Sequence, residues 1–276
     1  MYGVSQNIKN TANIILKILV VAIFAFPFLW VISVSLQTDA EVNTFPATII
    51  PKTPQFNNYV RAWQAGPFLT YFKNSVVIIV AIITIQMLIM IPAAYAFAMY
   101  DFKLKNILFS LVLIAFMVPT QVTFVPVYLM MGEWGLLRTL WPQILPFMTN
   151  AFGIFLLRQY FMQVPEELIE AARLDNASEL KIVYKLMIPM AKPALATIIL
   201  FSFVSHWNEY FWPLIMTNTT DVRPLTVGIA ALKSTEGFVN WNTIMAGNMF
   251  LIAPILIVYV FCSRFIIKAF SYSGIK

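Results

Sequence analysis

Residues 74–99 read NSVVIIVAIITIQMLIMIPAAYAFAM and contain no charged side chain. A helix needs about 20 predominantly apolar residues to cross the hydrocarbon core of a bilayer. Further stretches meet this requirement at 14–36, 106–131, 140–161, 193–217 and 247–268. The sequence therefore predicts an all-α, polytopic membrane protein with six transmembrane helices.

The composition excludes an ordinary soluble domain. Hydrophobic residues make up 60% of the chain and charged residues only 11%, whereas soluble domains carry about 25% charged residues. Lipid as the solvent explains both values. The net charge of +6 is accordingly interpreted as a guide to membrane orientation, and no nucleic-acid partner is expected.

The first apolar run has two possible readings. Lys9 and Lys17 precede it, as basic residues precede the apolar part of a signal peptide. However, the run is free of charge from Ile18 to Thr38, which is long for a signal peptide, and Ser33-Val34-Ser35 is only a weak cleavage site. We therefore interpret this run as a membrane span.

The basic residues indicate the orientation. Six spans put both termini on one side, together with twelve of the lysines and arginines: Lys9, Lys17, Lys103, Lys105, Arg158, Arg173, Lys181, Lys185, Lys192, Arg264, Lys268 and Lys276. The opposite side has six: Lys52, Arg61, Lys73, Arg138, Arg223 and Lys233. Basic residues favour the cytoplasmic side, so both termini and the 162–192 loop are predicted to be cytoplasmic. Of the two long external segments, 37–72 and 218–246, the first is expected to be irregular loop.

Residues 162–193 differ from the rest of the chain. They read MQVPEELIEAARLDNASELKIVYKLMIPMAKP and carry nine charges. Pro165 suits the first position of a helix that would run from Glu166 to Asp175. Asn176 follows, and asparagine tolerates the left-handed conformation that ends many helices.

A second helix should follow this turn. Ser178 can cap it, and we expect it to run to Ile188 and to end at Pro189. The segment is therefore predicted to be a helix–turn–helix at the membrane surface.

The first of these helices suits docking to another protein. Leu168, Ala171, Ala172 and Asp175 share one face, and the small alanines allow a close approach. Glu170 beside them can meet an arginine. The alternative is a helix lying on the bilayer, but its acidic residues would be repelled by anionic headgroups. The pattern favours docking.

The segment resembles the EAA coupling loop of bacterial ABC importer permeases. The matching positions are Glu170-Ala171-Ala172, Asp175, Asn176-Ala177, Pro189 and Pro193. The family usually has glycine where this chain has Asn176. Other positions are similar to the maltose-type carbohydrate subfamily: Asn58-Tyr59, Asn74-Ser75, Ala94-Tyr95-Ala96, Pro119, Trp207-Asn208-Glu209, Trp212-Pro213-Leu214 and Gly274-Ile275-Lys276.

The resemblance implies a domain organisation and a set of partners. Residues 1–69 would form an N-terminal helix and external loop, residues 70–268 the core permease domain with the coupling loop at 162–193, and residues 269–276 a cytoplasmic tail. A second related permease, two ATP-binding subunits carrying ATP-Mg, an extracytoplasmic solute-binding protein and a small solute would complete a bacterial inner-membrane importer. Coupling would fall to Leu168, Glu170, Ala171, Ala172, Asp175, Asn176 and Ala177.

The chain is not expected to be an enzyme or to bind a cofactor itself. It has no G-x-x-x-x-G-K-[ST] loop to hold a nucleotide phosphate. His206 is the only histidine and has no second set of metal ligands beside it. Energy must therefore come from partner subunits.

Glu209 is the leading candidate for contact with solute. It is the only carboxylate inside a predicted span, and charges within the membrane are usually functional. Trp207 and Trp212 could stack on a sugar, while Asn208 and Glu209 bond its hydroxyls. Interfacial anchoring by the aromatic residues is the structural alternative. Weaker pathway candidates are Gln121, Thr123, Asn150 and Asn248.

Other classes of membrane protein fit less well. A secondary transporter predicts several buried charges and internal symmetry, and neither is visible. A membrane enzyme needs clustered His, Asp or Glu side chains. A structural subunit without an ABC partner agrees with the composition but leaves the 162–193 loop unexplained. We therefore expect the permease subunit of an ATP-driven, binding-protein-dependent importer of a sugar or sugar-like solute.

Overall fold

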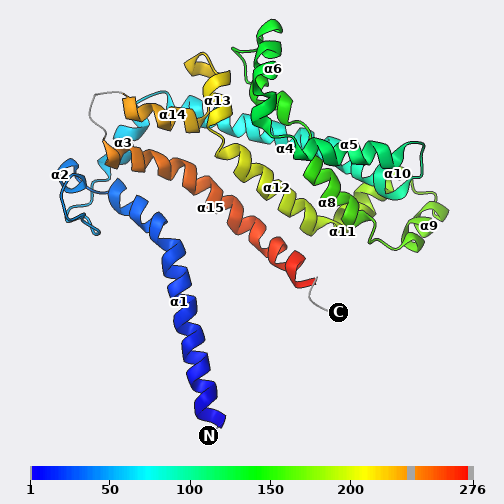
Figure 1. Cartoon of the computed structure of the whole chain (residues 1–276), viewed down its shortest axis with the longest axis horizontal. Helices are drawn as coiled ribbons and strands as arrows, with labels where there is room; N and C mark the ends of the chain where they lie inside the picture. The colour runs from blue at the N-terminus through cyan, green and yellow to red at the C-terminus, as the bar shows by residue number, and fades with distance from the viewer. Residues whose placement is uncertain (1, 235–239, 273–276) are drawn as a thin grey trace. The chain divides into compact units, whose positions relative to one another are not determined.

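A computed structural model describes residues 2–234 and 240–272, with side chains for 10–233 and 240–263. Every regular element in these ranges is helical. The chain divides into two compact units, Met1–Phe68 with Gly228–Ile252 and Leu69–Val227 with Ala253–Lys276. Figure 1 labels most of the helices of both units. The motif at Gly274-Ile275-Lys276 lies outside the described residues.

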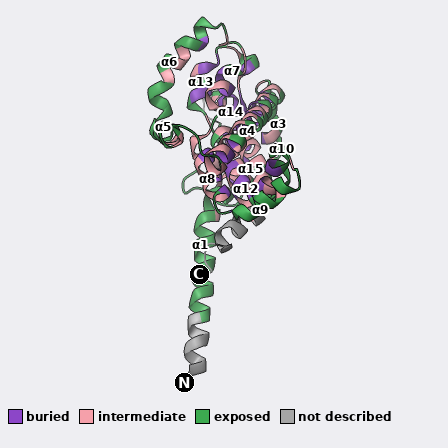
Figure 2. Ribbon diagram, turned by 90° about the vertical axis from the view of Figure 1, so that its right-hand side faces the viewer, coloured by how far each residue is buried: buried purple, intermediate pink, exposed green. Residues whose placement is uncertain are grey.

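The first unit contains the longest exposed helix. Helix α1 covers Tyr2–Ser35, and no part of the apolar window within its candidate span, Asn10–Ser35, is buried inside the protein. Figure 2 shows this exposure along α1. A helix that is apolar all round and still exposed requires lipid around it.

Residues 37–72, which are predicted to be external, are more ordered than the sequence indicates. It contains α2 (Asp39–Val42) and α3 (Asn57–Gln64). The cause at α2 is a capping box, in which the Glu41 N–H donates to Thr38 Oγ1 and the Thr38 N–H donates to Glu41 Oε2. The expectation of irregular loop is thus wrong for these two helices and applies only to the stretch between them.

Two buried asparagines hold the first unit together. The Asn58 side chain donates to the carbonyls of Ser35 (3.0 Å) and Gln37 (2.9 Å). The Asn242 side chain donates to the Gln37 carbonyl (3.2 Å) and to Asp39 Oδ1 (2.7 Å). Together they join the end of α1 to α3 and to the start of α15 (Trp241–Tyr272).

The second unit contains the remaining helices. In chain order these are α4 (Phe68–Met99), α5 (Lys105–Met117), α6 (Thr120–Glu133), α7 (Trp141–Ile144), η1 (Leu145–Phe147), α8 (Ala151–Phe161), α9 (Glu166–Leu174), α10 (Glu179–Ile182), η2 (Val183–Met187), α11 (Ile188–Met190), α12 (Lys192–Trp207), α13 (Phe211–Met216) and η3 (Thr220–Val222). Helix α14 (Leu225–Ala231) crosses into the first unit, where η4 (Leu232–Ser234) follows it.

The core of the second unit lies among α4, α8 and α12. Met90, Leu157 and Ile198 belong to one buried cluster. Gly153 permits the close packing, because a Cβ atom there would collide with the Met90 sulfur. Figure 2 shows buried residues gathered on α7 and α13 and exposed ones along α6.

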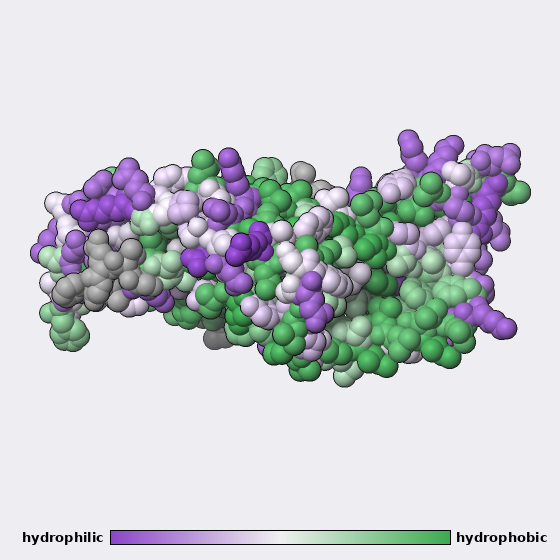
Figure 3. All heavy atoms as spheres, turned by 90° about the horizontal axis from the view of Figure 1, so that it is seen from above, coloured by the Kyte–Doolittle hydropathy of each residue, from purple (hydrophilic) through white to green (hydrophobic). Residues whose placement is uncertain are grey.

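Three described helices are long and apolar enough to cross a membrane: Asn10–Ser35, Phe68–Met99 and Trp241–Ser263. The number rises to five if each of two bent helix pairs is one span. Figure 3 shows broad hydrophobic areas on the surface, with hydrophilic side chains in separate patches. The all-helical, multi-pass fold is confirmed, and the count of six spans stays a prediction.

Several predicted spans are interrupted. Residues 106–131 form α5 and α6, which are bent by 94°, since the residue before Pro119 is extended. Residues 140–161 form α7, η1 and α8, and residues 193–217 form α12 and α13. The expectation of one helix per stretch is wrong at these breaks.

The second helix of the 162–193 loop continues past Pro189. It passes from α10 through the π-helical η2 into α11, which ends at Met190. The prediction that Pro189 ends the helix is therefore wrong. Proline removes a single N–H donor, and the altered hydrogen-bond spacing of the π-helical turn before it accommodates that loss.

Candidate solute pathway and coupling surface

At three places in the second unit, the helical backbone is interrupted within a predicted span. They are Val118-Pro119, residues 148–150 and residues 208–210. Non-helical backbone at membrane depth is tolerated only where it is buried in protein or lines a water-filled cavity. Such breaks are therefore the places where a solute cavity is expected.

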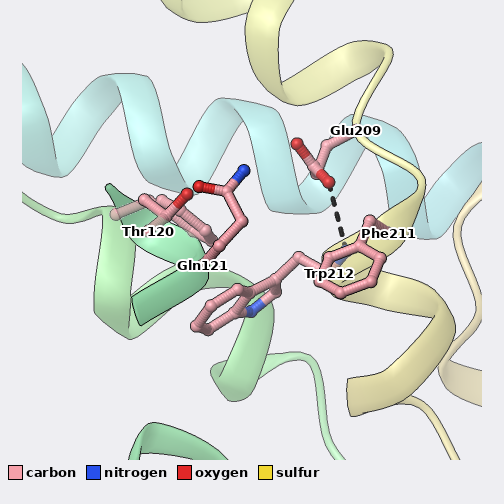
Figure 4. Close-up of a pocket in the computed structure, with 6 residues that line it drawn as sticks. Thr120, Gln121, Glu209, Phe211 and Trp212 are labelled. Carbon is pink, nitrogen blue, oxygen red and sulfur yellow. Dashed lines mark hydrogen bonds between the residues drawn. The ribbon is translucent and has the colours of Figure 1, made fainter. Parts of the chain in front are cut away.

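The first cavity, the Glu209 pocket, has a volume of about 240 Å³. The breaks and the adjoining helix starts supply its lining: Thr120, Gln121, Phe147, Glu209, Phe211 and Trp212. Figure 4 shows Gln121 and Glu209 extending into the same space, with the Trp212 ring beside them. The pocket thus combines a carboxylate, an amide, a hydroxyl and aromatic surface.

Trp212 is fixed in the wall of this pocket. Its indole N–H donates to the Pro142 carbonyl at 2.9 Å. Its ring meets Phe124 and Phe147 edge-on, with centroids 5.4 and 5.3 Å away. Only 4% of the residue is exposed. A rigid aromatic wall can present a ring to a solute at little cost in entropy.

Glu209 already makes two hydrogen bonds that hold the non-helical segment between α12 and α13. Its Oε1 accepts from the Trp212 backbone N–H at 3.1 Å and so caps α13 (Figure 4). Its backbone carbonyl accepts from the Thr226 hydroxyl at 2.8 Å. Within the described residues, Oε2 has no recorded hydrogen bond, which leaves it available for a ligand.

A second cavity, the His206 pocket, has a volume of about 360 Å³. It is lined by Phe116, Asn150, Phe152, Phe201, Ser202, Ser205 and His206. The Phe147 ring lies 4.8 Å from the His206 imidazole, centroid to centroid. Phe147 therefore contacts the lining of both pockets.

A hydrogen-bonded chain fixes the backbone beside Phe147. The Ser202 hydroxyl donates to Gln86 Oε1 at 2.7 Å, and Gln86 Nε2 donates to the Phe147 carbonyl at 2.8 Å. Gln86 and Ser202 are both buried. The broken span at 145–150 is thus tied to α4 and α12.

The structure brings some predicted pathway residues together and separates others. Gln121, Glu209 and Trp212 share the Glu209 pocket, whereas Asn150 lines the His206 pocket. Trp207 lines neither: it is 3% exposed and stacks on Phe203 with centroids 5.4 Å apart.

The remaining predicted residues make local contacts. Asn208 is exposed and its side chain donates to the Val204 carbonyl. The Thr123 hydroxyl donates to the Thr120 carbonyl. Asn248 belongs to the first unit, where its side-chain nitrogen lies 3.9 Å from the Met245 sulfur.

Sequence reasoning missed Thr120, Phe147, Phe211, Ser202 and Ser205 as lining residues. Thr120 follows Pro119, and this proline was the available signal of a break. Phe147 likewise follows Pro146, and Phe211 lies two residues before Pro213, whereas Ser202 and Ser205 lie inside α12 and carry no such signal.

The turn of the 162–193 loop is as predicted. Asn176 has φ +53°, in the left-handed region. The Ala177 N–H donates to the Ala172 carbonyl and the Asn176 N–H to the Arg173 carbonyl, each at 3.0 Å. This is the Schellman pattern that ends helices. Ser178 caps α10 through the Lys181 N–H, also as predicted.

The loop has one buried and one exposed face. Ile169, Ile182 and Met187 are buried in the cluster formed with α4, α8 and α12. The predicted coupling residues Leu168, Glu170, Ala171, Asp175 and Asn176 are exposed, and Ala172 and Ala177 are half-buried. Two exposed leucines were not predicted: Leu174 (83%) and Leu180 (71%). The loop therefore packs against the bundle with one face and leaves the other face exposed.

Glu179 joins the two loop helices to the end of α4. Its Oε1 accepts from Arg173 Nε at 3.0 Å, and its Oε2 accepts from the Tyr95 hydroxyl at 2.6 Å. The Tyr95 hydrogen bond, supported by the Arg173 guanidinium, lowers the pKa of the Glu179 carboxyl. The ionised form of Glu179 is thus favoured, and in this form it links the loop to the end of α4.

Comparison with known proteins decides the family. Residues 90–272 match the family described as "Binding-protein-dependent transport system inner membrane component". This chain belongs to that family. The permease is 34% identical to the arabinooligosaccharides transport system permease protein AraQ of Halalkalibacterium halodurans, over 92% of each chain.

Other relatives differ in solute. The sn-glycerol-3-phosphate transport system permease protein UgpE of Yersinia pestis is 30% identical, over 92% of the permease and 93% of UgpE. A crystal structure of a bacterial ABC transporter involved in the import of the acidic polysaccharide alginate has a chain 27% identical to the permease. That match has a TM-score of 0.81 and covers 94% of the permease and 97% of that chain.

Family membership confirms the predicted fold class and function. The permease is a multi-pass, non-catalytic membrane component of a binding-protein-dependent ABC importer. It is an inner-membrane component of a transport system that depends on a binding protein, and the family implies ATP hydrolysis by a partner ATPase.

Proposed function

We propose that the permease forms half of the translocation pathway for a neutral sugar or sugar-like solute, with the Glu209 pocket as a contact point. The pocket carries this proposal, since aromatic rings with a few polar groups are the usual lining of a solute site. Trp212 and Phe211 offer apolar faces, while Glu209 and Gln121 offer hydrogen-bonding groups for hydroxyls.

The charge of the pocket favours a neutral solute over an anionic one. UgpE and the alginate transporter are named for anionic solutes, whereas AraQ is named for arabinooligosaccharides. The six lining residues include one carboxylate and no basic side chain. The Glu209 carboxylate would repel a phosphate or a uronate, so an arabinooligosaccharide-like solute fits better.

A second part of the proposal concerns coupling. We propose that the exposed face of the 162–193 loop docks into an ATP-binding subunit, that both termini are cytoplasmic, and that a second related permease and a second ATP-binding subunit complete the complex. The support is the loop's exposed apolar face beside an unpaired charge: Glu170 forms no ion pair with any described residue. Such a charge on a compact helix suits an arginine in a partner's groove.

Glu170→Lys tests the coupling role. We expect binding-protein-stimulated ATPase activity and solute uptake in proteoliposomes to fall about 30-fold, because an interfacial charge pair becomes a repulsion. Glu167→Lys is the matched control, since it makes the same charge change on the same helix outside the EAA positions and should retain most activity. Equal stimulation of assembled Glu170→Lys complexes would overturn the coupling role.

Glu209→Gln tests the solute pocket. We expect uptake of a neutral arabinooligosaccharide to fall about tenfold, because a charge-assisted hydrogen bond becomes a neutral one. Basal ATPase activity should not change. Uptake that is unaffected for the neutral sugar, or wild-type transport of glycerol-3-phosphate in preference to it, would contradict the pocket assignment.

A further inference from the structure

A third cavity, the Arg158 pocket, shares no lining residue with the other two pockets or with the 162–193 loop. It measures about 520 Å³ and is lined by Asp101, Phe102, Leu104, Lys105, Asn106, Ile107 and Arg158. It lies where α4 has ended, α5 begins and α8 approaches its last turn. The pocket therefore lies at the ends of predicted spans, where a membrane meets water.

Two basic side chains, Arg158 and Lys105, line this pocket and are restrained by their neighbours. Arg158 Nε donates to the Phe97 carbonyl at 3.1 Å, and the guanidinium lies 4.2 Å from the centre of the Phe109 ring. The Lys105 side chain is only 19% exposed. Packing thus restrains both cations, and the Arg158 terminal nitrogens have no recorded hydrogen bond to a described residue, so they can bind a ligand.

The only acidic lining residue is weakly held. Asp101 Oδ1 accepts from Lys105 Nζ at 3.2 Å, but the Asp101 side chain is fully exposed. Exposed ion pairs contribute little free energy. An anion that enters the pocket can therefore replace Asp101 as the ion-pair partner of Lys105 and bind Arg158 at the same time.

The rim of the pocket is apolar and exposed. Leu104 and Ile107 are 60% and 58% exposed, and Leu111 on the same helix is 55% exposed. On a predicted membrane helix, such side chains suit acyl chains. A basic cavity beside an exposed apolar stripe matches an amphiphile with an anionic head better than it matches a soluble anion.

We propose that the Arg158 pocket binds the headgroup phosphate of an anionic phospholipid. Arg158 and Lys105 contact the phosphate, and the acyl chains lie along the exposed side of α5. Basic pockets between membrane helices on the cytoplasmic side favour anionic headgroups, and the charge bias of the sequence predicts that side for Lys105 and Arg158.

Native mass spectrometry of the assembled importer, titrated with phosphatidylglycerol or phosphatidylcholine, measures the binding. We expect wild type to retain phosphatidylglycerol preferentially. Lys105→Gln and Arg158→Gln should each weaken retention about fivefold, whereas Arg158→Lys should keep most of it. Asp101→Asn should strengthen retention, because it removes the competing carboxylate.

Lys73→Gln is the control, since Lys73 is an exposed lysine near the other end of α4 and its removal should change nothing. Equal retention of both lipids, or unchanged phosphatidylglycerol retention in Lys105→Gln, would overturn the proposal. So would binding of inorganic phosphate that displaces no lipid, because the site would then take a soluble anion. If Arg158→Gln fails to assemble, Lys105→Gln and Asp101→Asn still decide the outcome.

Discussion

The 162–193 loop and the breaks around the Glu209 pocket interrupt helices for different reasons. In the loop, Asn176 and Ser178 form the turn through contacts with their immediate neighbours. At the pocket, the chain opens between α12 and α13, and the break is held by Thr226 and Pro142, which lie far from it in sequence. The turn of the loop depends on local residues, whereas the break at the pocket combines a local contact, from Glu209 to the Trp212 N–H, with tertiary contacts.

Trp212→Ala should have the largest effect, because it removes the side chain that holds a pocket break. Truncation of a buried tryptophan costs about 3–5 kcal/mol, and Trp212 also loses its bond to the Pro142 carbonyl. We expect a large drop in melting temperature for the purified complex. Leu180→Ala, at an exposed leucine of the loop, should change it little. Comparable shifts for the two variants would show that Trp212 does not hold the break.

Gly153→Ala should have the next largest effect, because it acts on the packing that positions the His206 pocket. A Cβ at Gly153 would collide with the end of the buried Met90 side chain, with Ile198 in van der Waals contact at 3.4 Å. Overpacking of this kind costs about 1–3 kcal/mol. Gly132→Ala on α6 is the matched control, since its Cβ would meet only Leu137, at 3.6 Å. Denaturant unfolding measures the free energy of unfolding of both variants. Equal values would show that the Met90 side chain can move aside at the α4–α8 contact without loss of stability.

Asn176→Val tests the local kind of break. A β-branched residue in the left-handed conformation costs about 1–2 kcal/mol, and Asn176 has φ +53°. We expect lower stability and weaker stimulation of the ATPase, while Asn176→Gly should equal or exceed wild type. A glycine variant as damaged as the valine variant would show that the asparagine side chain itself is needed there.

The same contrast explains what the sequence could reveal. Spans, loop charges and the Asn176 turn follow from composition, charge bias and backbone preference, all of which act over a few residues. Phe147 and Trp207 could not be assigned in this way, because their surroundings come from helices distant in sequence. Gln121, Glu209 and Trp212 could be proposed from the sequence, since polar or aromatic residues in an apolar span are conspicuous. That they line one pocket could be seen only in the fold.

Tyr95→Phe should have the smallest effect, and it tests whether the hydrogen bond to Glu179 stabilises the contact between the loop and α4. The variant removes the 2.6 Å hydrogen bond to Glu179, which contributes about 0.5–1.5 kcal/mol; solvent around the exposed carboxylate keeps the loss near the lower value. The pKa of Glu179 is lowered from 4.5 in the folded protein, so its contribution is present above pH 4.5 and is lost as the pH falls through the folded value. The melting temperature of wild type should therefore fall more between pH 7 and pH 4 than that of Tyr95→Phe. If the two pH profiles coincide, the Tyr95 hydrogen bond does not stabilise the contact between loop and span, and that contact rests on other groups, such as the buried Ile169 and Met187.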